Sequence, residues 1–220
     1  VQGGFDLEPV YGSLSTYTRA KIGGLEGRAL RDGDLLPLRR TEADERAELR
    51  CTDRSWWREG GPVRVVLGPQ DDYFTADSTA AFFASEYHVT READRMGMRL
   101  DGPVLAHAKG HDIVSDGIAT GAIQVPGNGR PIVLLADHQT TGGYPKLGTV
   151  ISADVPRLGR LRPGDTLHFA RVEVEEAEAA RRLLEERIDR IVDRFGPAEP
   201  WLDEDALYRR NLVSGIVEPG

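Results

Sequence analysis

Short apolar runs separated by turn residues dominate the pattern of this 220-residue chain. Strands are predicted at residues 63–67, 87–90, 98–100, 122–125 and 132–136, because these runs are rich in Val, Ile and aromatic residues. Gly, Pro and Asp bound them, and the 25 glycines and 13 prolines interrupt the chain often. The pattern therefore predicts a mainly β protein with a few helices.

Two segments have helical periodicity instead. Residues 75–85 predict a short helix capped by Thr75 or Asp77, with Phe82 and Phe83 facing inward. Residues 174–195 predict a longer one, whose apolar positions fall three and four residues apart at Ala177, Leu184, Ile188, Ile191 and Phe195. Its acidic start and basic end suit the helix dipole, so we interpret it as a packing or subunit-contact helix.

The chain also resembles itself. Residues 30–38 (LRDGDLLPL) are similar to residues 161–169 (LRPGDTLHF), and residues 3–5 (GGF) are similar to residues 142–144 (GGY). Two matches in the same order indicate an internal duplication. We therefore expect two related subdomains, the first truncated because Val1 falls inside it. The expected division is a remnant of the first subdomain at 1–38, a linker at 39–61, a second subdomain with its C-terminal helix at 62–195, and a tail at 196–220.

Composition and charge exclude some classes of function. A net charge of −8 argues against nucleic-acid binding, which needs a basic face. The single cysteine, Cys51, cannot form an intramolecular disulfide, and no apolar run is long enough to span a bilayer. We expect a cytoplasmic protein without a membrane partner.

The candidate chemistry is concentrated after the predicted strand 132–136, in the polar segment 137–146 (DHQTTGGYPK). Such a cluster at the end of a buried strand is typical of a site on a β scaffold, although an ordinary Gly-rich hairpin with a solvated rim would have the same composition. Together with Arg95, Ser115, Asp116 and Gln124, the segment suits a planar amide or ureido ligand, and Arg95 or Lys146 suits its carboxylate or phosphate.

Other chemistries have weaker support. His107, His111 and Asp112 superficially have metal-ligand spacing, but Gly110 and the β-rich context argue against the helix that this spacing requires, so we expect no metal. There is no P-loop, and no nucleophile-elbow motif supports a hydrolytic triad built on Ser115 or Ser152.

Several motifs resemble the allophanate hydrolase subunit 2 family, also called the Kip antagonist or biotin-dependent carboxyltransferase family. They occur in order nearly as far as the C-terminal helix: Gly3-Gly4-Phe5-Asp6, Gly23-Gly24-Leu25-Glu26-Gly27-Arg28, Asp94-Arg95-Met96-Gly97, Ser115-Asp116-Gly117, Gly121 to Pro126, Pro131 to Asp137 and Gln139 to Pro145.

The resemblance implies a cyclophilin-like β-barrel and three alternative functions. The first is that of the C subunit of an ATP-dependent 5-oxoprolinase, which opens 5-oxoproline to glutamate. The second is transfer of a carboxyl group from carboxybiotin to urea or a similar amide. The third is a non-catalytic regulatory partner of a Kip-inhibitor-like subunit. The implied partners are a smaller related subunit (allophanate hydrolase subunit 1) and a lactam-utilisation subunit.

The predicted site combines the residues with these functions. The candidate catalytic residues are Arg95, Asp116 and Lys146, with the general base unassigned. The candidate substrate-binding residues are Ser115, Gln124, His138, Gln139, Thr140, Thr141, Gly142, Gly143 and Tyr144. Gln124, Gln139, Thr140 and the backbone of the two glycines would orient the amide, while Arg95 and Lys146 would stabilise negative charge.

Overall fold

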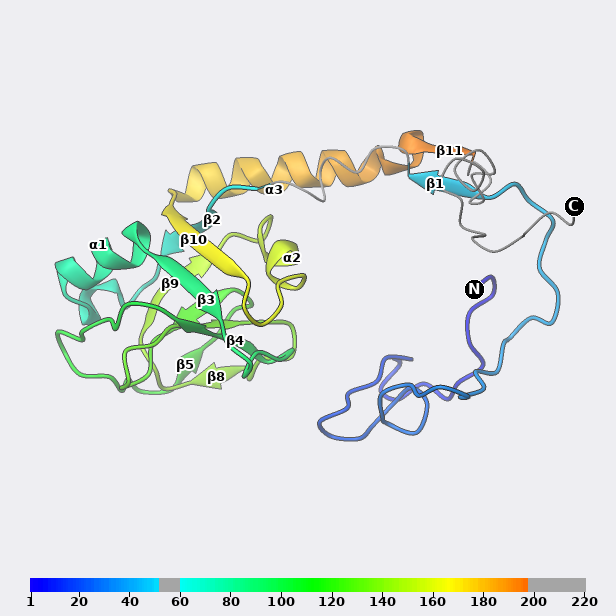
Figure 1. Ribbon diagram of the computed structural model, residues 1–220, viewed down its shortest axis with the longest axis horizontal. Coiled ribbons are helices and arrows are strands. Elements are labelled where there is room, and N and C mark those ends of the chain that lie inside the picture. The colour runs from blue at the N-terminus through cyan, green and yellow to red at the C-terminus, as the bar shows by residue number, and fades with distance from the viewer. Residues whose placement is uncertain (52–59, 198–220) are drawn as a thin grey trace, which may run out of the picture. The chain divides into compact units, whose positions relative to one another are not determined.

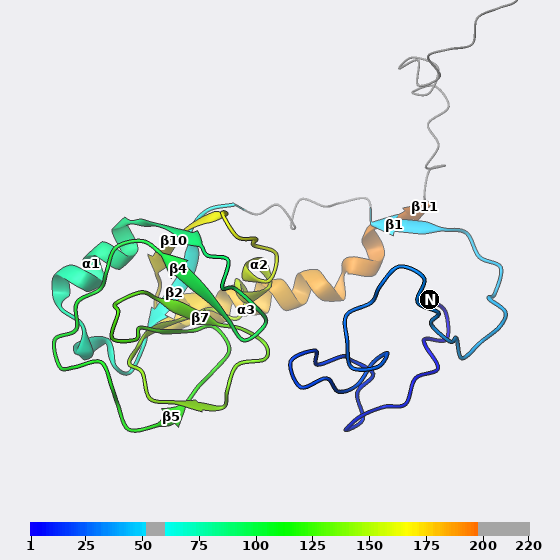
Figure 2. The same ribbon diagram turned by 60° about the horizontal axis from the view of Figure 1, so that its bottom comes forward.

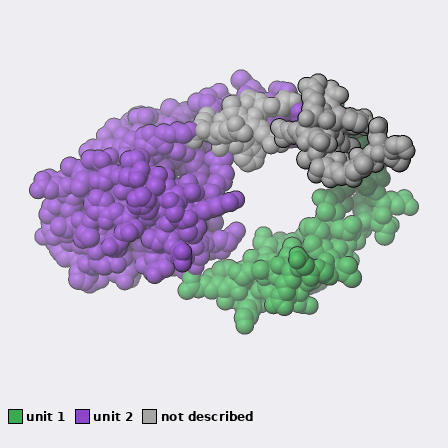
Figure 3. All heavy atoms as spheres, in the orientation of Figure 1, with its two compact units in different colours: residues 1–49, 197–220 green, residues 50–196 purple. Residues whose placement is uncertain are grey.

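The computed structural model describes residues 1–51 and 60–197, and it divides the chain into two compact units. One unit comprises residues 1–49 with 197–220, and the other comprises residues 50–196 (Figure 3). Part of the expected linker, residues 52–59, and nearly all of the expected tail, residues 198–220, lie outside the described residues. The expected domain boundaries therefore stay a prediction.

A closed seven-stranded barrel forms the body of the larger unit (Figure 1). Around it the strands follow the order β10-β2-β9-β6-β7-β4-β3. The β10–β2 pair is parallel and the other pairs are antiparallel. The barrel strands are β2 (Val63–Leu67), β3 (Glu86–Val89), β4 (Gly97–Asp101), β6 (Ala122–Gln124), β7 (Ile132–Leu134), β9 (Lys146–Val150) and β10 (Thr166–Arg171).

Smaller elements surround the barrel. β5 (Asp116–Gly117) and β8 (Thr141–Gly142) form a two-stranded sheet, and β5 lies to one side of the barrel strands in Figure 2. β1 (Leu49–Cys51) and β11 (Phe195–Pro197) form another. The described α-helices are α1 (Ala76–Ala84), α2 (Val155–Leu158) and α3 (Val174–Asp189), with 3-10 turns η2 (Asp71–Tyr73) and η3 (Ile191–Arg194).

The barrel closes over an apolar core in which α1 takes part. Phe82 of α1 is fully buried and stacks on Phe169 of β10, with ring centroids 4.5 Å apart. Thr75 caps the start of α1, because its side chain accepts a hydrogen bond from the Ser78 N–H. The predicted helix 75–85, its Thr75 cap and the buried Phe82 are thus confirmed, together with the mainly β class and the barrel.

The structure shortens one predicted helix and adds strands that were not predicted. The helix expected at 174–195 ends at Asp189, and a 3-10 turn and β11 follow it. Residues 116–117 form β5, which pairs with β8 and was not predicted as a strand. β9 and β10 were not predicted as strands, although β10 alternates exposed and buried positions as a half-buried strand should.

The smaller unit is built from turns, and one of them repeats in the barrel. In residues 31–34 the Arg31 N–H donates to Asp34 Oδ2, 2.7 Å away, and Gly33 has φ +88°. In residues 162–165 the Arg162 N–H donates to Asp165 Oδ2, also 2.7 Å away, and Gly164 has φ +94°. The two self-similar segments thus fold into the same turn, as copies of one ancestral segment would.

Candidate functional site

Lys146 at the start of β9 is a lysine whose ammonium group is almost completely buried. Its side chain is 6% exposed, whereas that of Asp116 is 55% exposed. Nζ donates to Asp116 Oδ2 at 2.7 Å and to the Gly117 carbonyl oxygen at 3.2 Å. These two acceptors satisfy two of its three N–H groups, so the described residues leave one donor for a ligand.

Gln124 of β6 lies opposite Lys146 in the barrel wall, where the register of the two strands shifts. Its side chain is buried, and within the described residues its Nε2 group has no hydrogen-bond partner. Tyr87 Oη, in the core, is the other such atom. A buried donor without an acceptor costs about 1–3 kcal/mol. The amide of Gln124 is therefore a group that a ligand carbonyl oxygen would stabilise.

The β5–β8 sheet places further predicted residues beside this pair. Asp116 pairs with Gly142 and Gly117 pairs with Thr141. A Cβ atom on Gly142 would lie 2.8 Å from Gln124 Nε2, so only glycine lets the β8 backbone approach this amide so closely. Gln124, Lys146, Asp116, Gly117 and Gly142 are called the Lys146 cluster below.

The electrostatics of the Lys146 cluster keep its carboxylate ionised. The hydrogen bond from Lys146 lowers the pKa of Asp116, and the Gly117 N–H, which donates to Asp116 Oδ1 at 2.8 Å, lowers it further. Gln70, after β2, was missed by sequence reasoning: its Oε1 accepts a hydrogen bond from the Lys146 N–H at 3.4 Å. Gln70 is a polar residue in the turn three positions after a predicted strand, so its signal resembled that of segment 137–146.

Arg95 lies in a different ion pair. Its Nε and Nη2 atoms contact the two carboxylate oxygens of Asp137 at 2.7 and 3.0 Å, and its side chain is 74% exposed. This bidentate contact lowers the pKa of Asp137 and raises that of Arg95. The structure therefore gives Arg95 a carboxylate partner on the turn after β7, and its side chain makes no such contact with the Lys146 cluster.

The remaining predicted residues lie on the outer side of the Lys146 cluster. Ser115, Gln139, Thr140, Thr141 and Tyr144 are exposed, whereas His138, Gly142 and Gly143 are half-buried. A Cβ atom on Gly143 would lie 3.9 Å from Ser115 Oγ, so these two residues are neighbours. The Thr140 carbonyl accepts a hydrogen bond from Ile118 N–H at 3.0 Å.

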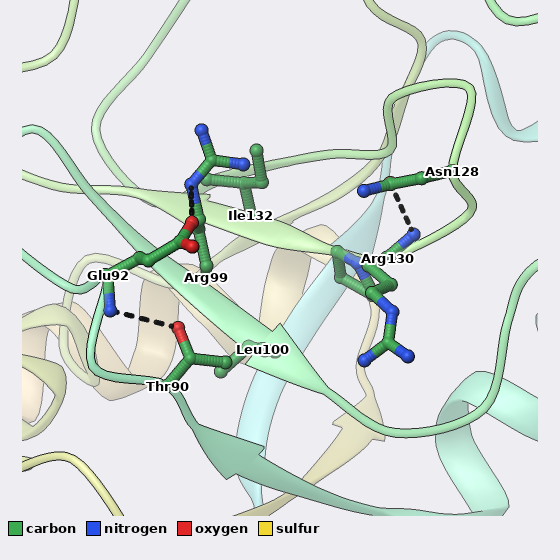
Figure 4. Close-up of a pocket in the computed structure, with 8 residues that line it drawn as sticks. Thr90, Glu92, Arg99, Leu100, Asn128, Arg130 and Ile132 are labelled. Carbon is green, nitrogen blue, oxygen red and sulfur yellow. Dashed lines mark hydrogen bonds and ion pairs between the residues drawn. The ribbon is translucent and has the colours of Figure 1, made fainter.

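Two hollows of the larger unit lie outside the Lys146 cluster. One, of about 230 Å³, is lined by Thr90, Glu92, Arg99, Leu100, Asn128, Arg130, Pro131 and Ile132 (Figure 4). Its arginines already have acidic partners, Glu92 for Arg99 and Asp101 for Arg130. The second, of about 390 Å³, is mostly apolar and includes Thr120.

The described residues contain no group of three or more His, Cys, Asp or Glu side chains that could hold a metal ion. His107 Nε2 instead lies 3.0 Å from the Val125 carbonyl oxygen. Among the residues that the structure describes, no helix has both the length and the apolar character that crossing a bilayer requires.

Residues 1–171 match the family described as "Carboxyltransferase domain, subdomain A and B", and the chain belongs to this family. This confirms the resemblance found in the motifs.

Relatives in this family include enzyme subunits and parts of larger enzymes. The chain is 41% identical over 182 residues to the C subunit of 5-oxoprolinase from Escherichia coli, covering 83% of this chain and 58% of that protein. It is 28% identical over 206 residues to urea amidolyase of Saccharomyces cerevisiae, covering 82% of this chain and 11% of that protein. The chain thus spans somewhat more than half of the first relative's length.

A solved structure shows the same fold. The crystal structure of the K. lactis urea amidolyase matches with a TM-score of 0.75 at 24% identity, covering 90% of this chain and 14% of that one. At this level of identity the match supports the fold alone.

Proposed function

We propose that this chain acts as the C subunit of an ATP-dependent 5-oxoprolinase complex, in which 5-oxo-L-proline is hydrolysed to glutamate. The identity of 41% to the corresponding E. coli protein, against 28% to the yeast urea amidolyase, favours this activity over carboxyl transfer to urea. The observation that carries the proposal at the level of the site is the unpartnered Nε2 donor of Gln124.

5-Oxoproline offers the two acceptors that the Lys146 cluster lacks. Its lactam carbonyl would accept a hydrogen bond from Gln124 Nε2, and its carboxylate would accept the third N–H of Lys146. The backbone of Gly142 lies against the amide of Gln124, so Gly142 would form one wall beside the bound lactam. Each acceptor would satisfy a buried donor, so binding would remove a cost that the unliganded protein carries.

Asp116 has a positioning role in this proposal. Its carboxylate and the Gly117 carbonyl hold the ammonium of Lys146 at the edge of the β5–β8 sheet. An ammonium fixed in a partly desolvated site stabilises negative charge that develops on a substrate oxygen more strongly than one in water. The general base of the reaction is not assigned to this chain, and neither is the binding of ATP.

The alternative function is transfer of a carboxyl group from carboxybiotin to urea or a similar amide, and the 28% identity to the yeast urea amidolyase favours it. Carboxybiotin supplies an activated carboxyl group on a ureido ring. The Lys146 cluster fits that ring as well, with Gln124 as donor to the ureido oxygen and Lys146 as the cation beside the carboxylate. The two functions therefore use the same donors.

The test is turnover by the reconstituted complex. The full chain is purified with the smaller related subunit and the lactam-utilisation subunit, then assayed with 5-oxoproline plus ATP and with urea plus carboxybiotin. The proposal predicts ATP-dependent glutamate formation that is lost in Lys146→Met. Turnover of urea alone would establish the alternative, and a stable complex without either activity would favour a regulatory partner.

A further inference from the structure

His138 is held by hydrogen bonds at both ring nitrogens, and neither involves the Lys146 cluster. Nδ1 lies 2.6 Å from the Gln139 carbonyl oxygen, and Nε2 lies 3.1 Å from Thr120 Oγ1. Because a carbonyl oxygen only accepts, Nδ1 must carry a proton. In the neutral ring Nε2 then has a lone pair, which accepts the hydroxyl proton of Thr120.

This geometry is that of a nucleophile and its base. A hydroxyl within hydrogen-bond reach of an imidazole, which is itself oriented by a third group, is the arrangement that activates serine and threonine nucleophiles. Here the third group is the Gln139 carbonyl in place of a carboxylate. The two residues come from separate turns, before β6 and after β7, which the barrel brings together.

Gly121, the residue after Thr120, anchors the backbone that carries the Thr120 side chain. Gly121 has φ +89°, its N–H donates to the Leu134 carbonyl at 2.7 Å, and its carbonyl accepts from the Val150 N–H at 2.9 Å. A Cβ atom on Gly121 would lie 2.9 Å from the Val150 carbonyl oxygen. A sharp, anchored turn therefore presents Thr120, which is exposed, at the edge of the barrel.

Thr120 is also one of the residues that line an apolar hollow. The hollow of about 390 Å³ is lined by Thr120 and by Val66, Thr149, Val150, Ile151, Ser152, Val155 and Ala177. These residues come from β2, β9, the segment after it, α2 and α3. Aliphatic side chains in such a hollow suit a short hydrocarbon chain, whereas a highly charged group would lose its hydration there.

We propose that Thr120 is an acyl acceptor activated by His138, and that the apolar hollow holds the acyl chain of an activated ester. Thr120 Oγ1 attacks the acyl carbonyl carbon while His138 Nε2 takes the hydroxyl proton. The bond to the leaving alkoxide or phenoxide then breaks, and His138 returns the proton to it. Water, deprotonated by His138, releases the acid and restores the threonine. This activity is independent of the function proposed for the Lys146 cluster.

The probes are p-nitrophenyl acetate and p-nitrophenyl butyrate, incubated with the purified full chain. We expect a burst of p-nitrophenolate and an acyl group mapped by peptide mass spectrometry to Thr120. Butyrate should react faster than acetate, by about fourfold for each added methylene that the hollow buries.

Three variants separate this chemistry from nonspecific acylation. Thr120→Val keeps the shape of the side chain and should abolish the adduct at that position. His138→Gln should slow acylation of Thr120 at least tenfold, because it removes the base. Thr166→Val, which removes an exposed threonine hydroxyl outside the hollow, should leave the rate unchanged. Equal acylation of Thr120 in His138→Gln, or adducts only at Ser152 or at lysines in the unaltered chain, would overturn the proposal.

Discussion

Replacing Gln124 by Met should separate the stability of the barrel from its function. Met is close to Gln in shape, so the replacement removes the amide without opening a cavity. Gln124 is 2% exposed and its Nε2 has no partner in the described residues. Removing an unsatisfied buried donor relieves a cost of about 1–3 kcal/mol, and we take the lower end of this range. We expect the free energy of unfolding to rise by about 1 kcal/mol.

The same replacement should impair the reaction. One lost hydrogen bond to a neutral carbonyl corresponds to roughly a tenfold loss, and one to an oxygen that becomes negative in the transition state corresponds to about 10²–10³-fold. The assays are urea unfolding of the chain followed by fluorescence, and kcat/KM of the reconstituted complex with 5-oxoproline.

Val125 provides the matched control, because it follows Gln124 directly and is fully buried without a polar group. Val125→Ala should lower the free energy of unfolding by about 2 kcal/mol while the folded protein keeps its turnover. If Gln124→Met lowers the free energy of unfolding as much as Val125→Ala does, or if its turnover equals that of the unaltered protein, the unsatisfied amide of Gln124 is not the group that binds the substrate.

Three further variants test the site and the core. Gly142→Ala places a Cβ atom 2.7 Å from Ile118 Cδ1. We expect it to raise the KM for 5-oxoproline about tenfold, which corresponds to the loss of one contact. Gly60→Ala is the control and should leave the kinetics unchanged, because no atom lies within 4 Å of its Cβ. Asp116 has a lowered pKa, so its contribution to stability is complete above the usual Asp range and is lost as the pH falls through the lowered value. Asp116→Asn should therefore narrow the difference between urea midpoints at pH 7 and pH 3, and an unchanged difference would contradict the ion pair. Phe82→Ala should cost about 3–5 kcal/mol in urea unfolding, and a loss below about 1 kcal/mol would mean that Phe82 is not in the core.

The elements predicted from sequence are those whose local pattern agrees with their tertiary environment. Strand 63–67 was predicted with its observed bounds, and helix α1 was predicted with its cap. β9 was missed because its sequence, KLGTV, begins with a lysine and contains a glycine, which interrupt the apolar signal. Lys146 is also a candidate functional residue, so the residue that gives β9 its functional interest is one of those that weakened its strand signal.

The sequence predicted which residues belong to the candidate site, but it did not predict which of them contact one another. Lys146, Asp116 and Gln124 were all named, but their contact depends on the β6–β9 register and on the β5–β8 sheet, which pair residues far apart in the chain. Arg95 was grouped with them by its charge, whereas its partner is Asp137, 42 positions away. Chain order carries no information on which of two carboxylates an arginine will contact.

Helix α3 has a consequence for how the chain exchanges its amide protons with water. None of its 16 residues is buried, and the contacts along its surface include the pairs Arg181–Glu185 and Glu178–Arg182. A helix of this length without a fully buried residue is marginal in water. Deuterium should therefore enter α3 of the isolated chain within the earliest labelling times, while the amides of β9 stay protected until the barrel itself opens.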